Sequence, residues 1–595
     1  MFEGLKAIRE EIENATITNP DRDEIRDGYQ LRFVGKDYAK FVSALPTETM
    51  LVPDTDWNSK DENKDSQNIF ITGDNLDALK HLVNAYERQI KCIYIDPPYN
   101  TGSDGFVYND TFNFTDAQLK EKLGMTDSDV TRLRALNGKC SHSAWLTFML
   151  PRLILAKRML AEDGVIFISI DDNEQANLKT LCDEIFNNFH GCLTWIKKTK
   201  PVNMGTAQFS IQSNIEYVLV YGRKAQDKHN YNLPQTESKN YPFEENGDRY
   251  RIESVDQRKN IGSMARPNMV YEVLGVNPKE GFRWQMSKEK RDELLNENKL
   301  FVKDGKLMKK IFEKDEEAYT LEPFWSHRID TGTAEDAKEE LEQLFGEDEV
   351  FETVKPSQLI KQILLFSTDK NDIILDFFAG SSTTADAVMQ LNSEDNGSRK
   401  YIMVQLNEDV ADGSEAKKHG YKTVDEISRK RIILSSKRLG DKSGFKHYKL
   451  AKISDNLVLD KIDNFDPTKP NLLADDMIKP FSGKDLGTGL NASGLETILT
   501  TWMVDDGYTL TTPVQEIKFG DYIAYSPKDS RRLYLISAGW ATENTRELLN
   551  LIGRNELSVQ TIIVYNHSFD FKTLTELKNN MKSVLEGNVE IIERF

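Results

Sequence analysis

Residues 68–100 read NIFITGDNLDALKHLVNAYERQIKCIYIDPPYN, and this stretch decides the fold. NIFITGDN is an apolar run that ends in a glycine turn, LDALKHLVNAYERQ carries apolar residues at helical spacing, and KCIYID is a second apolar run closed by two prolines. The pattern predicts a strand, a helix and a second strand. Repeated units of this kind build a mostly parallel sheet that helices cover on both faces.

The same alternation continues outward along the chain. Residues 143–161 have apolar side chains every three or four positions and predict a helix, with Pro151 as a candidate kink. GVIFISID then predicts a strand and NEQANLKTLCDEIF a helix. The alternation fades from about Trp195 to Phe351 and returns as SQLIKQILLFS, NDIILDFF, TTADAVMQLN and KYIMVQLNE. We therefore predict an α/β protein with a polar insertion.

The composition is that of a globular protein with several domains. Of 595 residues, 39% are hydrophobic and 29% are charged, and the net charge of −19 means that any contact with nucleic acid needs a local basic surface. No run reaches the roughly 18 apolar residues of a membrane span. The four cysteines, Cys92, Cys140, Cys182 and Cys192, have no Cys-x-x-Cys or zinc spacing. We expect reduced thiols, no metal and a cytoplasmic location.

One candidate site is the loop after KCIYID, where Asp96 is followed by Pro97, Pro98 and Tyr99. The prolines stiffen the turn and remove two N–H donors. A carboxylate, a carbonyl and an aromatic ring remain, and they suit a planar group with an amino substituent. If Asp96 and the Pro97 carbonyl accept the two N–H hydrogens of a nucleobase amine, its lone pair can aim at an electrophilic methyl group. The base must then leave the duplex. An ordinary strand-end turn is the alternative.

A second candidate site is the loop between NDIILD and TTADAV. Its small residues allow close approach to the backbone, and the following helix offers free N–H groups. Asp376 can hold a ligand ammonium, while Gln405 or Glu408 can bind ribose hydroxyls. An ammonium, a carboxylate and a ribose together describe S-adenosylmethionine. A small-residue connection with no ligand is the alternative. No Gly-Lys-Ser/Thr phosphate loop is present.

The order of the two loops resembles the β-class DNA amino-methyltransferases, in which the Asp-Pro-Pro-Tyr loop precedes the cofactor loop. Several strings resemble more narrowly the modification (Mod) subunits of type III restriction–modification systems. These are YQLRFVGKD (29–37), NIFITGDNLDALK (68–80), YIDPPYNTG (94–102), WLTFMLPRLILAKRMLAEDGVIFISIDDNEQANL (145–178), VFETVKPSQLI (350–360) and ILDFFAGSSTTADAV (374–388).

This resemblance implies a Rossmann-like methyltransferase sheet with an inserted target-recognition region and a C-terminal α/β module. It implies methyl transfer from S-adenosylmethionine to adenine N6 in a short sequence of double-stranded DNA. It also implies a homodimer that associates with a Res subunit, an ATP-dependent helicase-like endonuclease. The implied catalytic residues are Asp96, Pro97, Pro98 and Tyr99. The implied cofactor-binding residues are Asp376, Phe377, Phe378, Ala379, Gly380, Ser381 and Ser382, with Lys355, Pro356, Gln405 and Glu408.

The chain departs from this pattern at two positions. Many relatives have Gly-Ser-Gly where this chain has Gly380-Ser381-Ser382. Many amino-methyltransferases have a glutamate where KYIMVQLNE offers Gln405, so the ribose contact is either Gln405 or Glu408. Asp74 and Asn75 either touch the cofactor or end a strand.

Residues 193–228 carry a local excess of basic side chains, and further arginines and aromatic residues follow. Arg and Lys serve phosphates, while Arg, Asn and Gln can read base edges. A position between the two loops favours target recognition over an ordinary charged surface. The DNA-binding candidates are Lys197, Lys198, Lys200, Arg266 and Arg283, of which the last two could equally be structural.

These patterns divide the chain into five expected segments. They are an N-terminal helical or extended segment (1–60), a catalytic half (61–195), a target-recognition region (196–350), a cofactor-binding half (351–440) and a C-terminal module for dimer or partner contacts (441–595). Two alternatives stay open, namely a solitary β-class methyltransferase acting on adenine or cytosine, and a non-catalytic DNA-recognition subunit.

Overall fold

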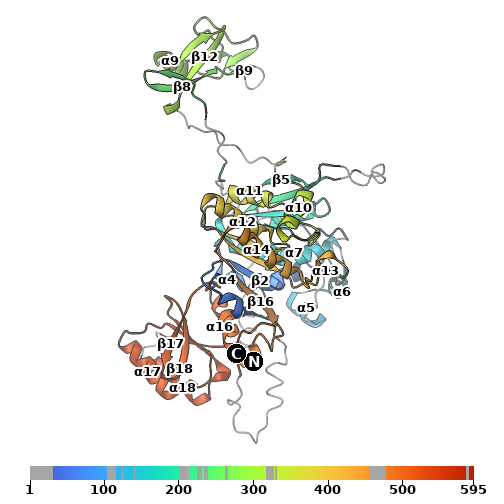
Figure 1. Cartoon of the computed structure of the whole chain (residues 1–595), viewed down its shortest axis with the longest axis vertical. Coiled ribbons are helices and arrows are strands. Elements are labelled where there is room, and N and C mark those ends of the chain that lie inside the picture. Colours follow the sequence, from blue (N-terminus) through green and yellow to red (C-terminus); the bar gives the residue numbers. More distant parts are fainter. Residues whose placement is uncertain are drawn as a thin grey trace. The chain divides into compact units, whose positions relative to one another are not determined.

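The computed structural model describes most of the chain and divides it into two compact units (Figure 1). One unit is Asn232–Phe324, and the other combines Met1–Tyr231 with Trp325–Phe595. The expected helix in residues 1–28 and Cys140 lie outside the described residues. The described residues are 31–102, 115–123, 125–139, 141–200, 211, 213–223, 231–233, 239–260, 265–315, 327–328, 331–453, 477–584 and 589–594.

The first unit is built on a ten-stranded sheet in the order β1-β16-β2-β15-β14-β3-β4-β6-β5-β13. From β16 to β4 the neighbouring strands are parallel, while β6 is antiparallel to both of its neighbours and β1 is antiparallel to β16. The strands are β1 (Thr49–Pro53), β2 (Ile69–Thr72), β3 (Ile90–Ile95), β4 (Leu160–Ile170), β5 (Phe189–Ile196), β6 (Ile215–Gly222), β13 (His327–Arg328), β14 (Ile373–Asp376), β15 (Lys400–Gln405) and β16 (Lys446–Lys452).

The long helices of this unit form two groups, and each group is connected by helix–helix contacts. One group contains α2 (Lys36–Ala44), α4 (Asn75–Ala85), α7 (His142–Met159), α8 (Gln175–Ile185) and α16 (Gly494–Asp505). The other contains α10 (Ala334–Phe345), α11 (Ser357–Ser367), α12 (Thr383–Asp395) and α14 (Val424–Leu439). Shorter helices are α3 (Thr55–Asn58), α5 (Asp116–Leu123), α6 (Asp127–Arg134) and α13 (Glu415–Lys418).

The chain crosses over in opposite directions on the two sides of the β14–β3 pair. From β14 it passes through α12 to β15, whereas from β3 it passes through α7 to β4. Because such crossovers are right-handed, the two helix groups cover opposite faces of the sheet. The doubly covered, Rossmann-like parallel sheet is therefore confirmed. Ligands bind outside the carboxyl ends of the strands at such a switch point.

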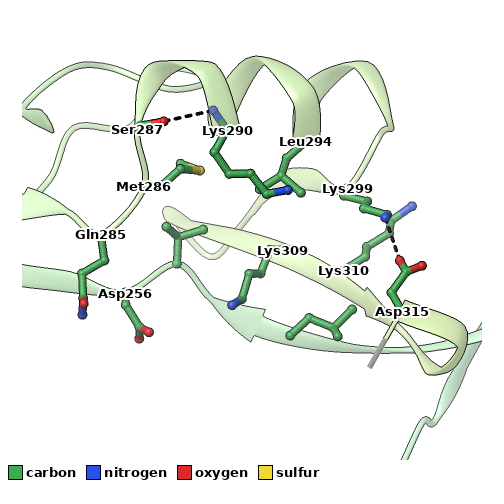
Figure 2. A pocket seen from close by; sticks show the side chains of 12 residues that line it. Asp256, Gln285, Met286, Ser287, Lys290, Leu294, Lys299, Lys309, Lys310 and Asp315 are labelled. Atoms are coloured by element: carbon green, nitrogen blue, oxygen red, sulfur yellow. Dashed lines mark hydrogen bonds and ion pairs between the residues drawn. The ribbon is translucent and has the colours of Figure 1, made fainter. Parts of the chain in front are cut away.

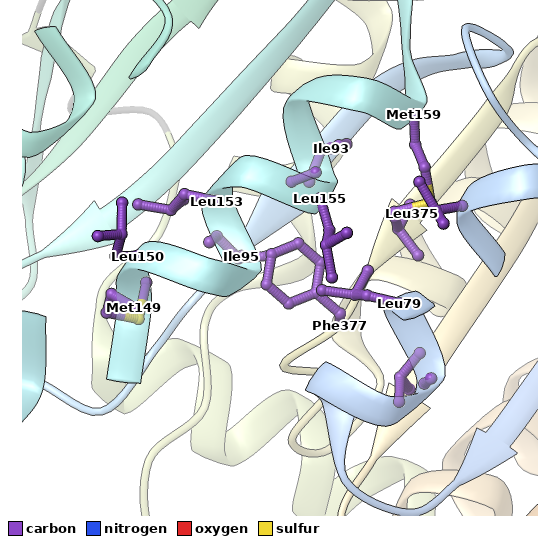
Figure 3. Packing of buried hydrophobic residues seen from close by; sticks show 14 of the residues in the cluster. Leu79, Ile93, Ile95, Met149, Leu150, Leu153, Leu155, Met159, Leu375 and Phe377 are labelled. Atoms are coloured by element: carbon purple, nitrogen blue, oxygen red, sulfur yellow. The ribbon is translucent and has the colours of Figure 1, made fainter. Parts of the chain in front are cut away.

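The α7 helix packs against the centre of the sheet (Figure 3). It begins where the Ser141 hydroxyl accepts a hydrogen bond from the Ala144 N–H, and it continues through Pro151. Met149 and Leu153 of this helix pack in one buried cluster with Ile95 of β3 and Leu375 of β14. Packing on this face therefore fixes the ends of the two strands that carry the candidate loops.

The C-terminal part of the chain contributes to the main sheet before it forms a second one. The β16 strand pairs with β1 and β2, and the Leu51 N–H donates to the Thr501 hydroxyl of α16 at 3.0 Å. The sheet therefore extends past the boundaries expected at residues 60 and 441. Beyond it, β17-β18-β19-β20-β21 form a five-stranded sheet. This sheet and the two helices between its strands are β17 (Val514–Phe519), β18 (Tyr522–Pro527), β19 (Arg532–Leu535), α17 (Thr542–Gly553), β20 (Thr561–Tyr565), α18 (Phe571–Val584) and β21 (Glu590–Arg594).

The second unit has its own small core, formed by Val255, Val273, Trp284, Met286, Leu300 and Leu307. It lies within the expected region 196–350, whereas β6, β13 and α10 of that region belong to the first unit. Its elements are β7 (Phe243–Glu245), β8 (Asp248–Ser254), β9 (Gln257–Lys259), β10 (Phe282–Trp284), α9 (Lys288–Asn296), β11 (Leu300–Lys303) and β12 (Lys306–Phe312). In neither unit do the described residues include a helix long and apolar enough to cross a membrane.

Candidate active site

The two candidate loops leave the sheet side by side. Asp96 follows β3 directly, and Asp376 is the last residue of β14. These strands are parallel neighbours, with Leu375 opposite Ile93. Asp96 and Asp376 are 280 residues apart in sequence, and the switch point brings them to the same edge of the sheet.

Both carboxylate oxygens of Asp96 are engaged. The Tyr99 hydroxyl donates to Oδ1 at 2.6 Å, and the Lys355 ammonium donates to Oδ2 at 2.7 Å. Lys355 also donates to the Tyr99 hydroxyl at 2.8 Å. Within the described part of the chain, the Pro97 carbonyl accepts no hydrogen bond. Lys355 therefore contacts the first loop, and the resemblance placed it at the second.

Glu216 of β6 completes this group of charges, which we call the Asp96 cluster: Asp96, Tyr99, Lys197, Glu216 and Lys355. Its Oε2 lies 3.1 Å from the Tyr99 hydroxyl and 3.3 Å from the Lys355 Nζ, and its Oε1 accepts from Lys197 at 3.2 Å. Burial acts to raise the pKa of Glu216, but the two lysines overcome it and hold that pKa below its usual value.

Lys355 and Tyr99 keep their usual charge states within the Asp96 cluster. Burial acts to lower the pKa of Lys355, yet the carboxylates of Asp96 and Glu216 raise it, so the ammonium stays charged. Burial and the same two carboxylates raise the pKa of Tyr99, so its hydroxyl stays a neutral donor. The sequence analysis did not identify Glu216. A lone acid within the apolar strand IEYVLVYG was the signal that could have identified it.

Hydrogen bonds from two neighbouring segments, α7 and the turn before α8, hold the backbone of the Asp-Pro-Pro-Tyr loop. Trp145 of α7 is fully buried, as expected for a core residue, and its indole N–H donates to the Pro98 carbonyl at 2.6 Å. The Asn173 amide donates to the carbonyls of Tyr99 and Asn100 at 3.0 and 2.6 Å. The loop is thus preorganised by α7 and by the turn before α8.

Glu174 adds a second support. Its side chain is fully buried, and its Oε1 lies 2.6 Å from Nδ1 of His142 and accepts from the Asn100 amide at 2.7 Å. Asn100 adopts a left-handed conformation, with a φ of 58°. His142 therefore has a structural role, because it helps to orient the residue that follows Tyr99.

Asp376 is a buried carboxylate with neutral partners. The Thr384 hydroxyl donates to Oδ2 at 2.6 Å, and the Phe378 N–H donates to Oδ1 at 3.0 Å. Burial raises the pKa of Asp376 to about 7 despite these two hydrogen bonds, and the nearby charge of Asp96 adds to the rise. Among the described residues Asp376 forms no ion pair, so a cationic ligand would supply its missing counter-charge.

The rest of the second loop is mostly buried and tightly turned. Phe377, Ala379, Ser381 and Ser382 are all at most 5% exposed. Ser382 caps the start of α12 with a φ of 63°, a region in which glycine is strongly favoured over residues with a Cβ. This conformation explains why relatives carry glycine at that position. The buried Ser382 hydroxyl has no hydrogen-bond partner.

The α14 helix supports the second loop through Arg431, which the sequence did not identify. This buried guanidinium donates to the hydroxyls of Ser381 at 3.1 Å and Thr383 at 2.8 Å, and it pairs with the buried Asp386 at 3.1 Å. The Ser428 hydroxyl donates to the Gly380 carbonyl. Arg431 is one of five basic residues in α14, so no local pattern distinguished it from its exposed neighbours.

The remaining cofactor candidates occupy different environments. Gln405 is half-buried, and its side-chain oxygen accepts from the Gly380 N–H at 2.8 Å, whereas Glu408 is exposed. Pro356 is buried at the start of α11. Asp74 caps α4, and the Asn75 amide donates to the Phe377 carbonyl at 2.8 Å. Both Asp74 and Asn75 thus have structural roles beside the loop.

The DNA-binding candidates are also placed differently from one another. Lys198, Lys200 and Arg266 are exposed, and Lys197 is half-buried in its ion pair with Glu216. Arg283 is 6% exposed and donates to the Trp284 carbonyl at 3.3 Å, so it packs inside the second unit.

The second unit also contains a cavity of about 450 Å³ between α9 and β12 (Figure 2). Four lysines line it, and each pairs with an acidic residue. The pairs are Lys290 with Glu293, Lys299 with Asp315, Lys309 with Glu253 and Lys310 with Glu245. None of the residues nominated from the sequence lines this cavity.

Comparison with known proteins gives two family matches and several full-length relatives. A family described as DNA methylase matches residues 90–418, and the type III R-M EcoP15I C-terminal domain matches residues 493–591. The StyLTI Mod subunit, a type III restriction–modification enzyme of Salmonella typhimurium, is 40% identical over 96% of this chain and 91% of its own length. The EcoP15I Mod subunit of Escherichia coli is 34% identical over 94% of this chain and 90% of its own length. The type II methyltransferase M.KpnI of Klebsiella pneumoniae is 32% identical over 70% of this chain and 99% of its own length.

Proposed function

This chain belongs to the family of type III restriction–modification Mod subunits, and we propose that it methylates adenine N6 in double-stranded DNA with the residues at the β3–β14 switch point. The observation that carries the assignment of residues is the adjacency of the two loops. An amine-binding carboxylate, Asp96, and a cation-binding carboxylate, Asp376, leave neighbouring strands at the same edge of one sheet. Methyl transfer requires the two substrates to meet in this way.

The second loop fits S-adenosylmethionine, which supplies an electrophilic methyl group on a sulfonium. Asp376 offers a buried, uncompensated carboxylate for the donor's ammonium. Gln405 and the exposed Glu408, which follow the neighbouring strand, are placed for the ribose. The Gln405 side chain already bonds to the Gly380 N–H. Glu408 is therefore the better candidate for the ribose hydroxyls.

The first loop fits the amino group of a base. Asp96 and the free Pro97 carbonyl accept the two N–H hydrogens, and the Tyr99 ring offers a stacking face. The nitrogen lone pair then points to the methyl carbon, a C–N bond forms and the C–S bond breaks. The methylated nitrogen loses one proton, for which Asp96 is an adjacent base. The target base reaches the loop only outside the helix, so base extrusion is part of the proposal.

The assembly follows from the family. We infer that the chain acts as a homodimer and associates with a Res subunit. The C-terminal family match at residues 493–591, which covers most of the five-stranded sheet, supports a role in such contacts. The exposed Lys198, Lys200 and Arg266 remain candidates for DNA contact.

The test is methyl transfer to unmethylated duplex DNA, followed by mass spectrometry of the nucleosides and mapping of the modified site. We expect N6-methyldeoxyadenosine from the wild type and none from Asp96→Ala. Asp163→Asn is the matched control, because Asp163 of β4 pairs with Lys91 near the start of β3, at the opposite end of that strand from Asp96. This control should keep its activity.

Each other outcome has a definite meaning. Methylcytosine would keep the site and change the target base. A product from Asp96→Ala at the wild-type rate would remove Asp96 from the mechanism. If the wild type binds S-adenosylmethionine and yields no product on any duplex, with or without Res, the chain would be a non-catalytic recognition subunit.

A further inference from the structure

Asp96 has no unused oxygen for the role that the proposed function gives it. Its Oδ1 accepts from Tyr99 and its Oδ2 from Lys355, both at 2.7 Å or less. The Lys355 side chain is 11% exposed, so this lysine is held within the protein and is not a solvated counter-ion. Each oxygen can accept one more hydrogen bond, but a base amine that enters the loop must share Asp96 with two donors that are already in place.

Glu216 is a second acceptor for both of these donors. The Tyr99 hydroxyl lies 3.1 Å from its Oε2, and the Lys355 Nζ lies 3.3 Å from the same oxygen. Tyr99 has one hydroxyl hydrogen, so it donates to Asp96 or to Glu216 at any moment. Two hydrogen-bond patterns are thus available within the same set of atoms.

We propose that Glu216 is a positioning residue that takes over Lys355 and Tyr99 when the target base enters, and so frees Asp96 to accept the base amine. The inference rests on the proposed function and assigns a role to Glu216 and Lys355 within that same site. When no base is bound, the Lys355 ammonium pairs with Asp96. In the loaded state it pairs with Glu216.

The surroundings of Glu216 suit this role. It lies on β6 between β4 and β5, so its backbone is fixed by sheet hydrogen bonds. Lys197 holds its other oxygen at 3.2 Å, which keeps Oε2 directed at the Asp96 cluster. Two lysines and two carboxylates balance in charge, and the exchange leaves this balance unchanged. Neither Lys355 nor Glu216 is left as an unpaired buried charge.

The test compares kcat at saturating DNA and methyl donor, using the site that the mapping experiment identifies. Glu216→Gln keeps the shape and removes the charge, so Lys355 is left with Asp96 as its only carboxylate. We expect kcat to fall about 10- to 100-fold, because charged acceptors bind an ammonium far more strongly than neutral ones. The KM for S-adenosylmethionine should change less than about twofold, since equal losses in kcat and kcat/KM mark an effect on the reacting state.

Two double variants separate partner exchange from simple charge balance. Glu216→Gln with Lys355→Met removes the lysine that pairs with Asp96. We expect its kcat to be at least about fivefold above that of Glu216→Gln alone. Glu216→Gln with Lys197→Met has the same net charge but keeps Lys355 on Asp96, and it should show no recovery. Lys361→Met is the control for loss of a lysine, because Lys361 pairs with Glu394 on the neighbouring helices α11 and α12. It should match the wild type.

Three results would overturn the inference. They are an unchanged kcat in Glu216→Gln, equal recovery in the two double variants, and a Glu216→Gln/Lys355→Met variant that is slower than Glu216→Gln. Calorimetric binding of S-adenosylmethionine confirms that each variant is folded. A wild type that binds the donor and transfers no methyl group would instead refute the proposed function, and this inference with it.

Discussion

At the scale of single residues, the two acids of the site, Asp96 and Asp376, have different hydrogen-bond and ion-pair partners. Asp96 lies beside a buried lysine, whereas Asp376 has only neutral hydrogen-bond donors. Burial therefore raises the pKa of Asp376 to about 7, and Asp376 keeps its proton more readily than an ordinary acid. A cationic ligand would reverse that effect, because it stabilises the ionised form.

This asymmetry predicts a pH-dependent affinity for S-adenosylmethionine. Below about pH 7 the carboxyl of Asp376 is protonated in the free protein, and binding an ammonium must first remove that proton. Affinity should therefore fall as pH decreases from 7.5 to 5.5, by up to about tenfold per unit below pH 7. Isothermal titration calorimetry at several pH values measures this dependence.

The control for that titration is Asp376→Asn. The amide keeps an acceptor oxygen for the Phe378 N–H, and the Thr384 hydroxyl can turn to accept from it. We expect weak binding with no dependence on pH between 5.5 and 7.5. A wild-type affinity that is equally flat would show that Asp376 does not hold the ammonium.

At the scale of elements, α14 and α12 are joined beneath the second loop by a buried ion pair. Arg431 and Asp386 are both fully buried, and Arg431 also reaches the hydroxyls of Ser381 and Thr383. Arg438 pairs with the other oxygen of Asp386 at 2.8 Å, but its side chain is 38% exposed. The two arginines share one carboxylate and differ in burial.

This difference predicts unequal effects of two matched substitutions. Arg431→Met should lower the free energy of unfolding by about 3 kcal/mol, because it leaves the buried Asp386 with one cationic partner, the half-exposed Arg438. It should also weaken binding of S-adenosylmethionine, since the loop loses two hydrogen bonds. Arg438→Met should cost no more than about 1 kcal/mol. Urea denaturation measures both effects, and equal losses would contradict the assigned importance of the buried pair.

At the scale of the whole molecule, the second unit is an insertion with its own core. Residues Asn232–Phe324 form a compact unit, and the switch point, the Asp96 cluster and Asp376 all belong to the other unit. Folding of the first unit and binding of the methyl donor should therefore not require the insertion.

Replacement of residues 232–324 by a flexible Gly/Ser linker tests this division. We expect affinity for S-adenosylmethionine within about threefold of the wild type, because none of the residues assigned to the donor is removed. Methyl transfer to duplex DNA should be lost if this unit supplies target recognition. Loss of donor binding would show that the two units fold as one, and full retention of specific methylation would assign recognition to the first unit.

Local sequence determined the elements that carry the chemistry. The strands before Asp96 and Asp376, the helix at 143–161 and the strand at KYIMVQLNE all lie where their periodicity predicts. Apolar runs and helical spacing are properties of neighbouring residues, so a strand or helix of this strength needs little help from the rest of the chain. The residue types of the two loops, an Asp-Pro-Pro-Tyr turn and a run of small residues after Asp376, are also local and can be read directly from the sequence.

Only the tertiary structure decided which distant residues share a site. Lys355 contacts Asp96 across 259 positions, and Glu216 of β6 joins them. Long-range pairing also decides the order of the strands in the sheet, the inclusion of β1 and β16, and the boundaries of the inserted unit. Such contacts follow from how all the strands pack together, and no local pattern encodes them. The sequence by itself therefore indicated the two candidate loops and the substrates proposed for them, and only the tertiary structure decided which charges surround Asp96.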